Sequence, residues 1–204
     1  MLNMNINKAI RKQIKSYKRF VLIMCFVFFV LPVFPFIYNK ATPFYLGFLA
    51  VIEAMIVASV VICLGRLRIK FAYERKGRIK VKYGLAAETI NIYCSKVMYV
   101  DIEVLEPQIN RFEDFKIIVL TNSRFKSKKL KKVGYDFMKK YTLTAYQYNK
   151  LKVRNPEDEY YYFIIGSGGL KKYELLSTIY STCVHAGFSE AAIEKIKLYR
   201  DSQL

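Results

Sequence analysis

The sequence predicts an α+β protein, in which an N-terminal two-helix transmembrane hairpin precedes a cytoplasmic, antiparallel β-rich domain with C-terminal helices. Three observations indicate this class: two long apolar runs near the N-terminus, alternation of apolar and polar residues after them, and helical periodicity towards the C-terminus. The chain has 204 residues, and 53% of them are hydrophobic. We expect three parts: a basic amphipathic segment 1–19, a hairpin 20–65 and a domain 66–204.

Two apolar runs form the predicted hairpin. Residues 20–38 contain no charged side chain, and residues 43–65 contain only Glu53. As helices, both runs are long enough to cross a hydrocarbon layer about 30 Å thick. The short connection between them requires an antiparallel arrangement. A cleaved signal peptide is the alternative for the first run, but this run is longer than a usual signal core and a second span follows almost at once.

The distribution of basic residues predicts the orientation. Residues 66–82 contain eight lysines and arginines, whereas the connection between the spans contains only Lys40. Basic residues accumulate on the cytoplasmic side of a membrane. We therefore expect a multi-pass protein of the cell membrane with both termini in the cytoplasm. Residues 1–19 support this orientation because they contain no acid and six basic residues, Lys8, Arg11, Lys12, Lys15, Lys18 and Arg19.

The second span carries one carboxylate beside a row of small residues. Ala50, Ala54 and Ala58 recur every four residues, and such a row allows close approach of another helix. Glu53 borders this row near the middle of the span, where an ionised carboxylate is costly. We therefore expect a neutral, hydrogen-bonded Glu53 at a helix–helix contact. The partner is either the first span or a second copy of the chain.

The basic segment has an apolar face formed by Ile6, Ile10, Ile14 and Tyr17. This spacing is typical of a helix on the inner membrane surface, and we expect it to turn from there into the first span. Four basic residues on the other faces would bind anionic lipid headgroups, at about 1 kcal/mol each. The alternative is that they only set the topology. These residues are Lys8, Arg11, Lys12 and Lys15.

The domain begins with strand signals and ends with helix signals. Strands are expected at 78–84, 88–94 and 97–105, followed by a hairpin of 115–121 with 124–130, in an antiparallel meander. The pattern over 134–151 fits a helix or a strand, and 160–165 reads as a strand. A helix is predicted to end at Gly187, and Ser189 is suited to cap the last helix.

A second basic region coincides with the outer strand of the predicted hairpin. The net charge of +18 also suits nucleic acid, but attachment to a membrane makes anionic lipids the more economical partner. We expect no nucleic-acid partner. The turn 166–172 is glycine-rich and could cradle an anion, although its spacing matches no nucleotide-binding fingerprint. The basic residues predicted to bind lipid or an anionic ligand here are Lys126, Lys128, Lys129, Lys131 and Lys132.

No catalytic or metal-binding pattern stands out. His185 is the only histidine, and Cys183 would lie on another face of the same helix, so a local Cys–His pair is not expected. The acids are few and scattered. We predict a non-catalytic protein without a cofactor or metal.

The segments KYGLAAETINIYCSKVMYVDIEVLE and FKIIVLTNSRFKSKKL, which follow the hairpin, resemble the bacterial PH-like domains of small membrane proteins. The resemblance covers about residues 78–135 and centres on Tyr99, Val100, Asp101 and Ile102. It implies a partly closed β-barrel or sandwich capped by a C-terminal helix, and it implies no catalytic residue. The second C-terminal helix and the aromatic segment 135–163 depart from this pattern.

The sequence therefore predicts a membrane-anchored cytoplasmic binding module for a protein partner or for anionic lipid headgroups. One alternative is a membrane-tethered receptor for a soluble anionic ligand such as a nucleotide. Another is a subunit of a larger transport, secretion or immunity complex, or a homo-oligomer, assembled through the transmembrane helices.

Overall fold

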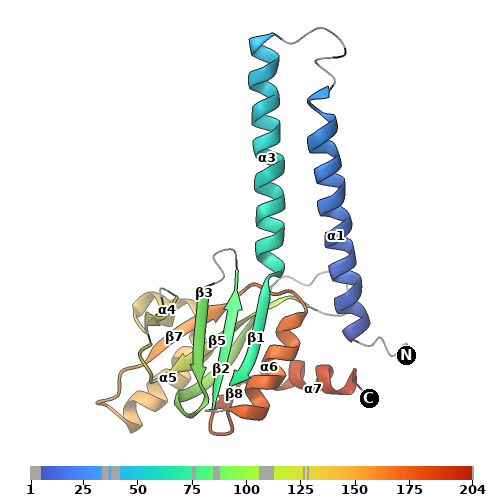
Figure 1. Cartoon of the computed structure of the whole chain (residues 1–204). Coiled ribbons are helices and arrows are strands. Elements are labelled where there is room, and N and C mark those ends of the chain that lie inside the picture. Colours follow the sequence, from blue (N-terminus) through green and yellow to red (C-terminus); the bar gives the residue numbers. More distant parts are fainter. Residues whose placement is uncertain are drawn as a thin grey trace.

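The computed structural model describes residues 6–33, 37, 42–74, 77–84, 88–105, 113–125, 127 and 129–203. Two long helices, α1 (Ile6–Val30) and α3 (Pro43–Leu67), lie side by side and project from one side of a domain built of strands and shorter helices (Figure 1). The α+β class predicted from the sequence is confirmed.

Helix α1 joins the basic segment directly to the apolar run. Neither proline nor glycine occurs within Ile6–Val30, so nothing interrupts the backbone hydrogen bonds between the two parts. The predicted surface helix that turns into a separate span is therefore wrong. Pro32 follows the end of α1.

Helix α3 is strongly apolar. Its most apolar stretch has a mean hydropathy of 2.5, and none of that stretch is buried inside the protein. Within the described ranges, α3 alone is long and apolar enough to cross a membrane. The predicted first span, 20–38, is divided between the apolar half of α1 and residues outside the described ranges, so a second crossing stays a prediction.

The first sheet is an antiparallel meander that starts directly after α3. Its strands are β1 (Ile69–Glu74), β2 (Arg78–Tyr83) and β3 (Glu88–Tyr93), in the order β1-β2-β3. Strands β2 and β3 agree with the prediction. Strand β1 was not predicted.

The second sheet is mixed and follows a short 3-10 turn, η1 (Cys94–Lys96). Its order is β6-β7-β5-β4-β8, and β8 is parallel to β4 whereas the other pairs are antiparallel. An entirely antiparallel domain is therefore not what forms. The strands are β4 (Val97–Val104), β5 (Phe115–Thr121), β6 (Lys131–Lys132), β7 (Tyr161–Ile165) and β8 (Gly187–Phe188).

The predicted hairpin between 115–121 and 124–130 does not form. Both edges of β5 are occupied, one by β4 and the other by β7. The short β6 pairs with β7 instead, so the predicted basic strand is reduced to two lysines. Strand β7 comes from a distant part of the sequence, which local alternation cannot reveal.

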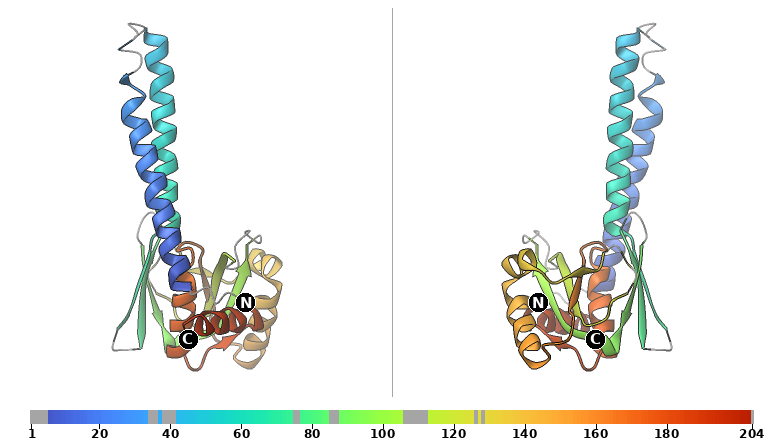
Figure 2. Two further views of the ribbon diagram at one scale, coloured as in Figure 1. Left: turned by 90° about the vertical axis from the view of Figure 1, so that its right-hand side faces the viewer. Right: turned by 90° about the vertical axis from the view of Figure 1, so that its left-hand side faces the viewer.

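Helices cover the second sheet on both faces. Helices α4 (Tyr135–Lys140) and α5 (Thr142–Arg154) lie on the flank opposite the first sheet (Figure 2). On the other face α6 (Lys171–Thr182) contacts β5, and α7 (Glu190–Asp201) contacts β4. The ambiguous region 134–151 is thus helical.

Two details of the C-terminal helices differ in outcome. The Ser189 hydroxyl accepts a hydrogen bond of 3.2 Å from the amide of Ala192, which confirms the predicted cap of α7. Helix α6 ends at Thr182 rather than at Gly187, because Gly187 pairs with Tyr99 in the sheet.

One continuous core links the two sheets, α6, α7 and the start of α1. It contains Ile79, Ile90, Val100 and Ile179, all fully buried. The PH-like character of the domain stays a prediction.

Candidate functional site

The junction between the helical hairpin and the domain is the most closely connected region outside the core. Arg68 is the only residue between α3 and β1, and its carbonyl accepts a 3.0 Å hydrogen bond from the amide of Gly84. The carbonyl of Arg66 accepts a bond of 2.7 Å from the amide of Gly168. The hairpin is thus joined to the domain by both its chain and its hydrogen bonds, without a linker.

The first turns of α1 pack into the domain. Ile6 is fully buried and Ile10 is 9% exposed, and Ile6 belongs to the main core. The apolar stripe that predicted a helix on the membrane surface therefore contacts protein at this end. Ile14 and Tyr17 continue the stripe and are half-buried. Burial also raises the pKa of the Tyr17 hydroxyl.

The glycine-rich turn before α6 is packed against both helices of the hairpin. Gly168 and Gly169 have φ angles of 121° and 51°, which favour glycine. A Cβ atom on Gly168 would lie 2.8 Å from Cγ2 of Ile69, and one on Gly169 would lie 2.8 Å from Oε1 of Gln13. These two glycines therefore permit the close approach of the turn to α1 and β1.

The amides at the start of α6 are used within the protein. The amide of Leu170 donates to Oε1 of Gln13 at 3.2 Å. Those of Lys171, Lys172 and Tyr173 donate to the carbonyls of the residues three positions earlier. This pattern weakens the predicted phosphate cradle, because a cradle needs amides that point at the ligand.

The neighbouring lysines of this turn have different environments. Lys172 is fully buried, and its ammonium group donates to Oδ1 of Asp114 at 2.5 Å, to the Gly166 carbonyl at 3.1 Å and to the Phe115 carbonyl. Burial lowers its pKa, although Asp114 opposes the shift. Lys172 thus fastens the turn to β5, whereas Lys171 is half-buried and lies at the surface of the junction.

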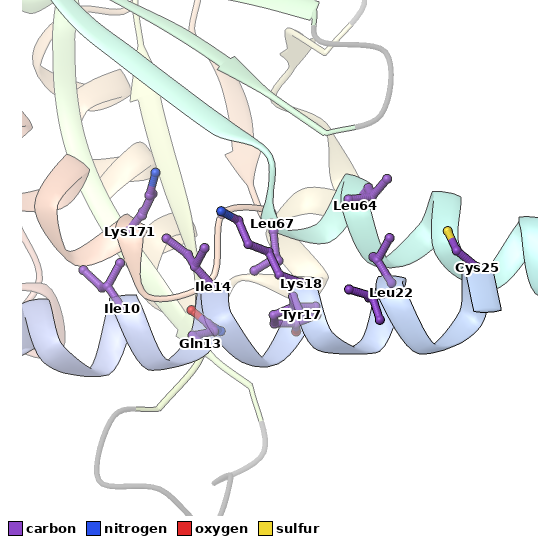
Figure 3. Close-up of a pocket in the computed structure, with 12 residues that line it drawn as sticks. Ile10, Gln13, Ile14, Tyr17, Lys18, Leu22, Cys25, Leu64, Leu67 and Lys171 are labelled. Carbon is purple, nitrogen blue, oxygen red and sulfur yellow. The ribbon is translucent and has the colours of Figure 1, made fainter. Parts of the chain in front are cut away.

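A groove of about 600 Å³ lies between α1, the end of α3 and the glycine-rich turn. Figure 3 shows Lys18 and Lys171 towards the domain end and Leu22, Cys25 and Leu64 towards the hairpin end. The lining is otherwise apolar except for Gln13, Tyr17 and the Gly168 backbone. Sequence patterns missed this groove because it combines residues from three distant segments.

The predicted basic residues divide into two groups. All four on α1 are exposed: Lys8, Arg11, Lys12 and Lys15. They lie on the helix that reaches from the domain into the hairpin (Figure 1).

The second basic group does not form one surface in the described part of the chain. Lys129 lies over the ring of Tyr83, with Nζ 3.6 Å from the ring centre, and Lys132 pairs with Glu159 at 2.5 Å. Lys131 is exposed. Lys126 and Lys128 lie outside the described residues.

The alanine row of α3 does not face α1. Ala50, Ala54 and Ala58 are all exposed, whereas Ile52 and Ile56 on the adjoining face are half-buried. Glu53 is half-buried at the edge between these faces. A contact made through the alanines would therefore involve another molecule rather than the first helix of the hairpin.

The remaining candidates for chemistry are dispersed. Within the described ranges, no group of three or more His, Cys, Asp or Glu side chains is placed to hold a metal ion. Cys183 is buried, and its pKa is raised mainly by burial, which opposes formation of a reactive thiolate.

Comparisons with known protein families, with curated proteins and with solved structures gave no match. The functional argument therefore rests on the residues of this chain.

Proposed function

We propose that the chain is a membrane-anchored cytoplasmic binding module, without catalytic activity, that recognises anionic lipid headgroups. The observation that carries this proposal is the exposed basic side of α1. Lys8, Arg11 and Lys12 lie within the first two turns of the helix, whose other side is buried in the domain. The domain thereby holds these charges in a fixed position beside the hairpin.

The charge distribution supports placement of this surface at the inner membrane face. Arg66 and Arg68 are exposed at the domain end of α3, and Lys15, Lys18 and Arg19 are exposed on α1. In the proposed topology both helices cross the membrane and both termini are cytoplasmic. The basic side of α1 then lies within a Debye length of the anionic leaflet, where each charge contributes about 1 kcal/mol.

The sequence resemblance to PH-like membrane proteins supports the same class of function, a binding module next to a helical hairpin. A protein partner remains the second candidate, and one observation favours it. The exposed alanine row of α3 would allow another transmembrane helix to approach closely.

The proposal can be tested with the full chain in nanodiscs that contain equal amounts of phosphatidylglycerol and phosphatidylcholine. Native mass spectrometry of the released protein counts the lipids that remain bound. We expect enrichment of phosphatidylglycerol, and we expect it to decrease with added salt because the charges are exposed.

A matched pair of triple variants locates the effect. Lys8→Gln, Arg11→Gln and Lys12→Gln together should reduce the enrichment. The control replaces Lys150, Arg154 and Lys197, which are also exposed, and removes the same charge from α5 and α7. Equal binding of both lipids by the unmodified chain, or equal loss in the two triple variants, would contradict the proposal.

A further inference from the structure

The groove at the junction has two chemically different ends. The hairpin end is formed by Leu22, Cys25 and Leu64, which continue into the apolar surfaces of α1 and α3. The domain end carries Lys18 and Lys171 (Figure 3). A ligand that fits this groove has an extended apolar part joined to a negatively charged group.

The charge at the domain end is not neutralised by the groove itself. No aspartate or glutamate is among the lining residues, and neither lysine makes an ion pair within the described part of the chain. Asp114 is close enough to influence the pKa of Tyr17, but its carboxylate is paired with Lys172. Two ammonium groups at one end of an apolar groove favour an anion there.

The position of the groove narrows the choice of ligand. The groove lies where the apolar part of α3 gives way to Arg66 and Arg68, the expected level of the lipid phosphates. Its volume of about 600 Å³ is within the usual range for a small-molecule site. A lipid of the adjoining leaflet can enter from the side and leave part of its chains in the bilayer.

We propose that this groove binds one anionic phospholipid, whose phosphate is held by Lys18 and Lys171 and one of whose acyl chains lies between α1 and α3. This inference rests on the proposed membrane anchorage and adds a defined site to the general headgroup preference. The lysines supply the selectivity, because an acyl chain gains little by moving from bilayer to groove. The site involves none of the residues replaced in the triple variants above.

The chain contains no tryptophan, so a single introduced tryptophan reports its own surroundings. Leu22→Trp places the probe at the groove, since Leu22 is a lining residue and is 70% exposed. Ile23→Trp is the control. Ile23 is 56% exposed, lies one residue along the same helix and is not a lining residue, so the depths differ by only about 1.5 Å.

The experiment measures tryptophan quenching by brominated lipids in bilayers of unlabelled phosphatidylcholine. With a minor fraction of brominated phosphatidylglycerol, we expect at least about twofold stronger quenching of Leu22→Trp than of Ile23→Trp, because a bound lipid raises the local bromine concentration. With the same fraction of brominated phosphatidylcholine, the two probes should be quenched equally. Excess quenching by both lipids would indicate a neutral lipid site and overturn the proposal.

The lysines are tested in the Leu22→Trp background. Lys18→Gln with Lys171→Gln should abolish the excess, Lys18→Arg with Lys171→Arg should retain it, and Lys150→Gln with Lys197→Gln should leave it unchanged. Persistence of the excess in the Lys18 and Lys171 glutamine variant would refute this site. The two proposals can fail separately: phosphatidylglycerol enrichment without excess quenching at residue 22 removes the groove site alone, and excess quenching without an effect of the α1 triple variant removes the basic helix surface alone.

Discussion

The side-chain carbonyl of Gln13 accepts a hydrogen bond of 3.2 Å from the backbone amide of Leu170, 157 residues further along the chain. This bond joins the helix that enters the hairpin to the turn that starts α6. Together with the burial of Ile6 and Ile10, it makes α1 part of both the hairpin and the domain. Ligands on α1 therefore bind to a surface whose shape depends on the domain.

Gly168→Ala should destabilise the junction. The new Cβ would lie 2.9 Å from Cβ of Ile69, near the backbone, where β1 cannot move without disturbing its pairing with β2. Strain at the φ angle of 121° adds to this contact, and we expect a loss of about 1–3 kcal/mol in the free energy of unfolding. Thermal unfolding of the purified chain, followed by circular dichroism, measures the change.

Gly77→Ala is the control for backbone strain alone. Gly77 has a φ angle of 65°, but a Cβ there would have no neighbour within 4 Å. Its melting temperature should decrease by less than that of Gly168→Ala. Equal decreases would show that the contact with Ile69 contributes nothing.

Lys172→Met should be destabilising, although methionine has a similar length. It removes the donor to the carbonyls of Phe115 and Gly166 and leaves Asp114 without its partner. The unpaired polar groups should cost about 1–3 kcal/mol. Lys171→Met is the neighbouring control and should change the melting temperature little, and a ranking in the opposite order would contradict the assigned roles.

The contribution of Lys172 should depend on pH. Its pKa is lowered in the folded chain because it is buried, so the folded chain loses this proton at a lower pH than the unfolded chain does. Between the lowered pKa and the ordinary value of 10.5, the unfolded chain binds more protons, and stability increases with pH. The difference in unfolding free energy between the unmodified chain and Lys172→Met should therefore increase over this interval in chemical denaturation, and a constant difference would show that the ammonium group is not desolvated.

The proposed topology predicts which added cysteines a membrane-impermeant maleimide can reach in intact cells. Lys40→Cys should react, whereas Lys131→Cys should react only after the membrane is opened. The native cysteines give a low background, because Cys94 and Cys183 are buried and the other two lie in the apolar parts of the hairpin. Reaction of Lys131→Cys in intact cells would reverse the orientation and exclude a cytoplasmic domain.

Local patterns were sufficient where a single segment determines its own structure. The uninterrupted apolar run of α3, the alternation in β2 and β3 and the Ser189 cap were all readable because hydrophobic periodicity and capping act over a few residues. The same patterns identified the basic residues of α1 and the exposed alanine row. What they could not identify was the neighbour of each face.

Only the tertiary structure decided those neighbours. The stripe that begins at Ile6 looks the same whether it faces lipid or protein, and the domain core covers its first turns. Strand β5 had a plausible partner at 124–130, but β4 and the distant β7 occupy both of its edges. Gln13, Lys18 and Lys171 show no relation in the sequence, because their proximity results from α1 docking on the turn before α6. Side-chain periodicity specifies which face of an element is apolar, and long-range packing specifies what covers it.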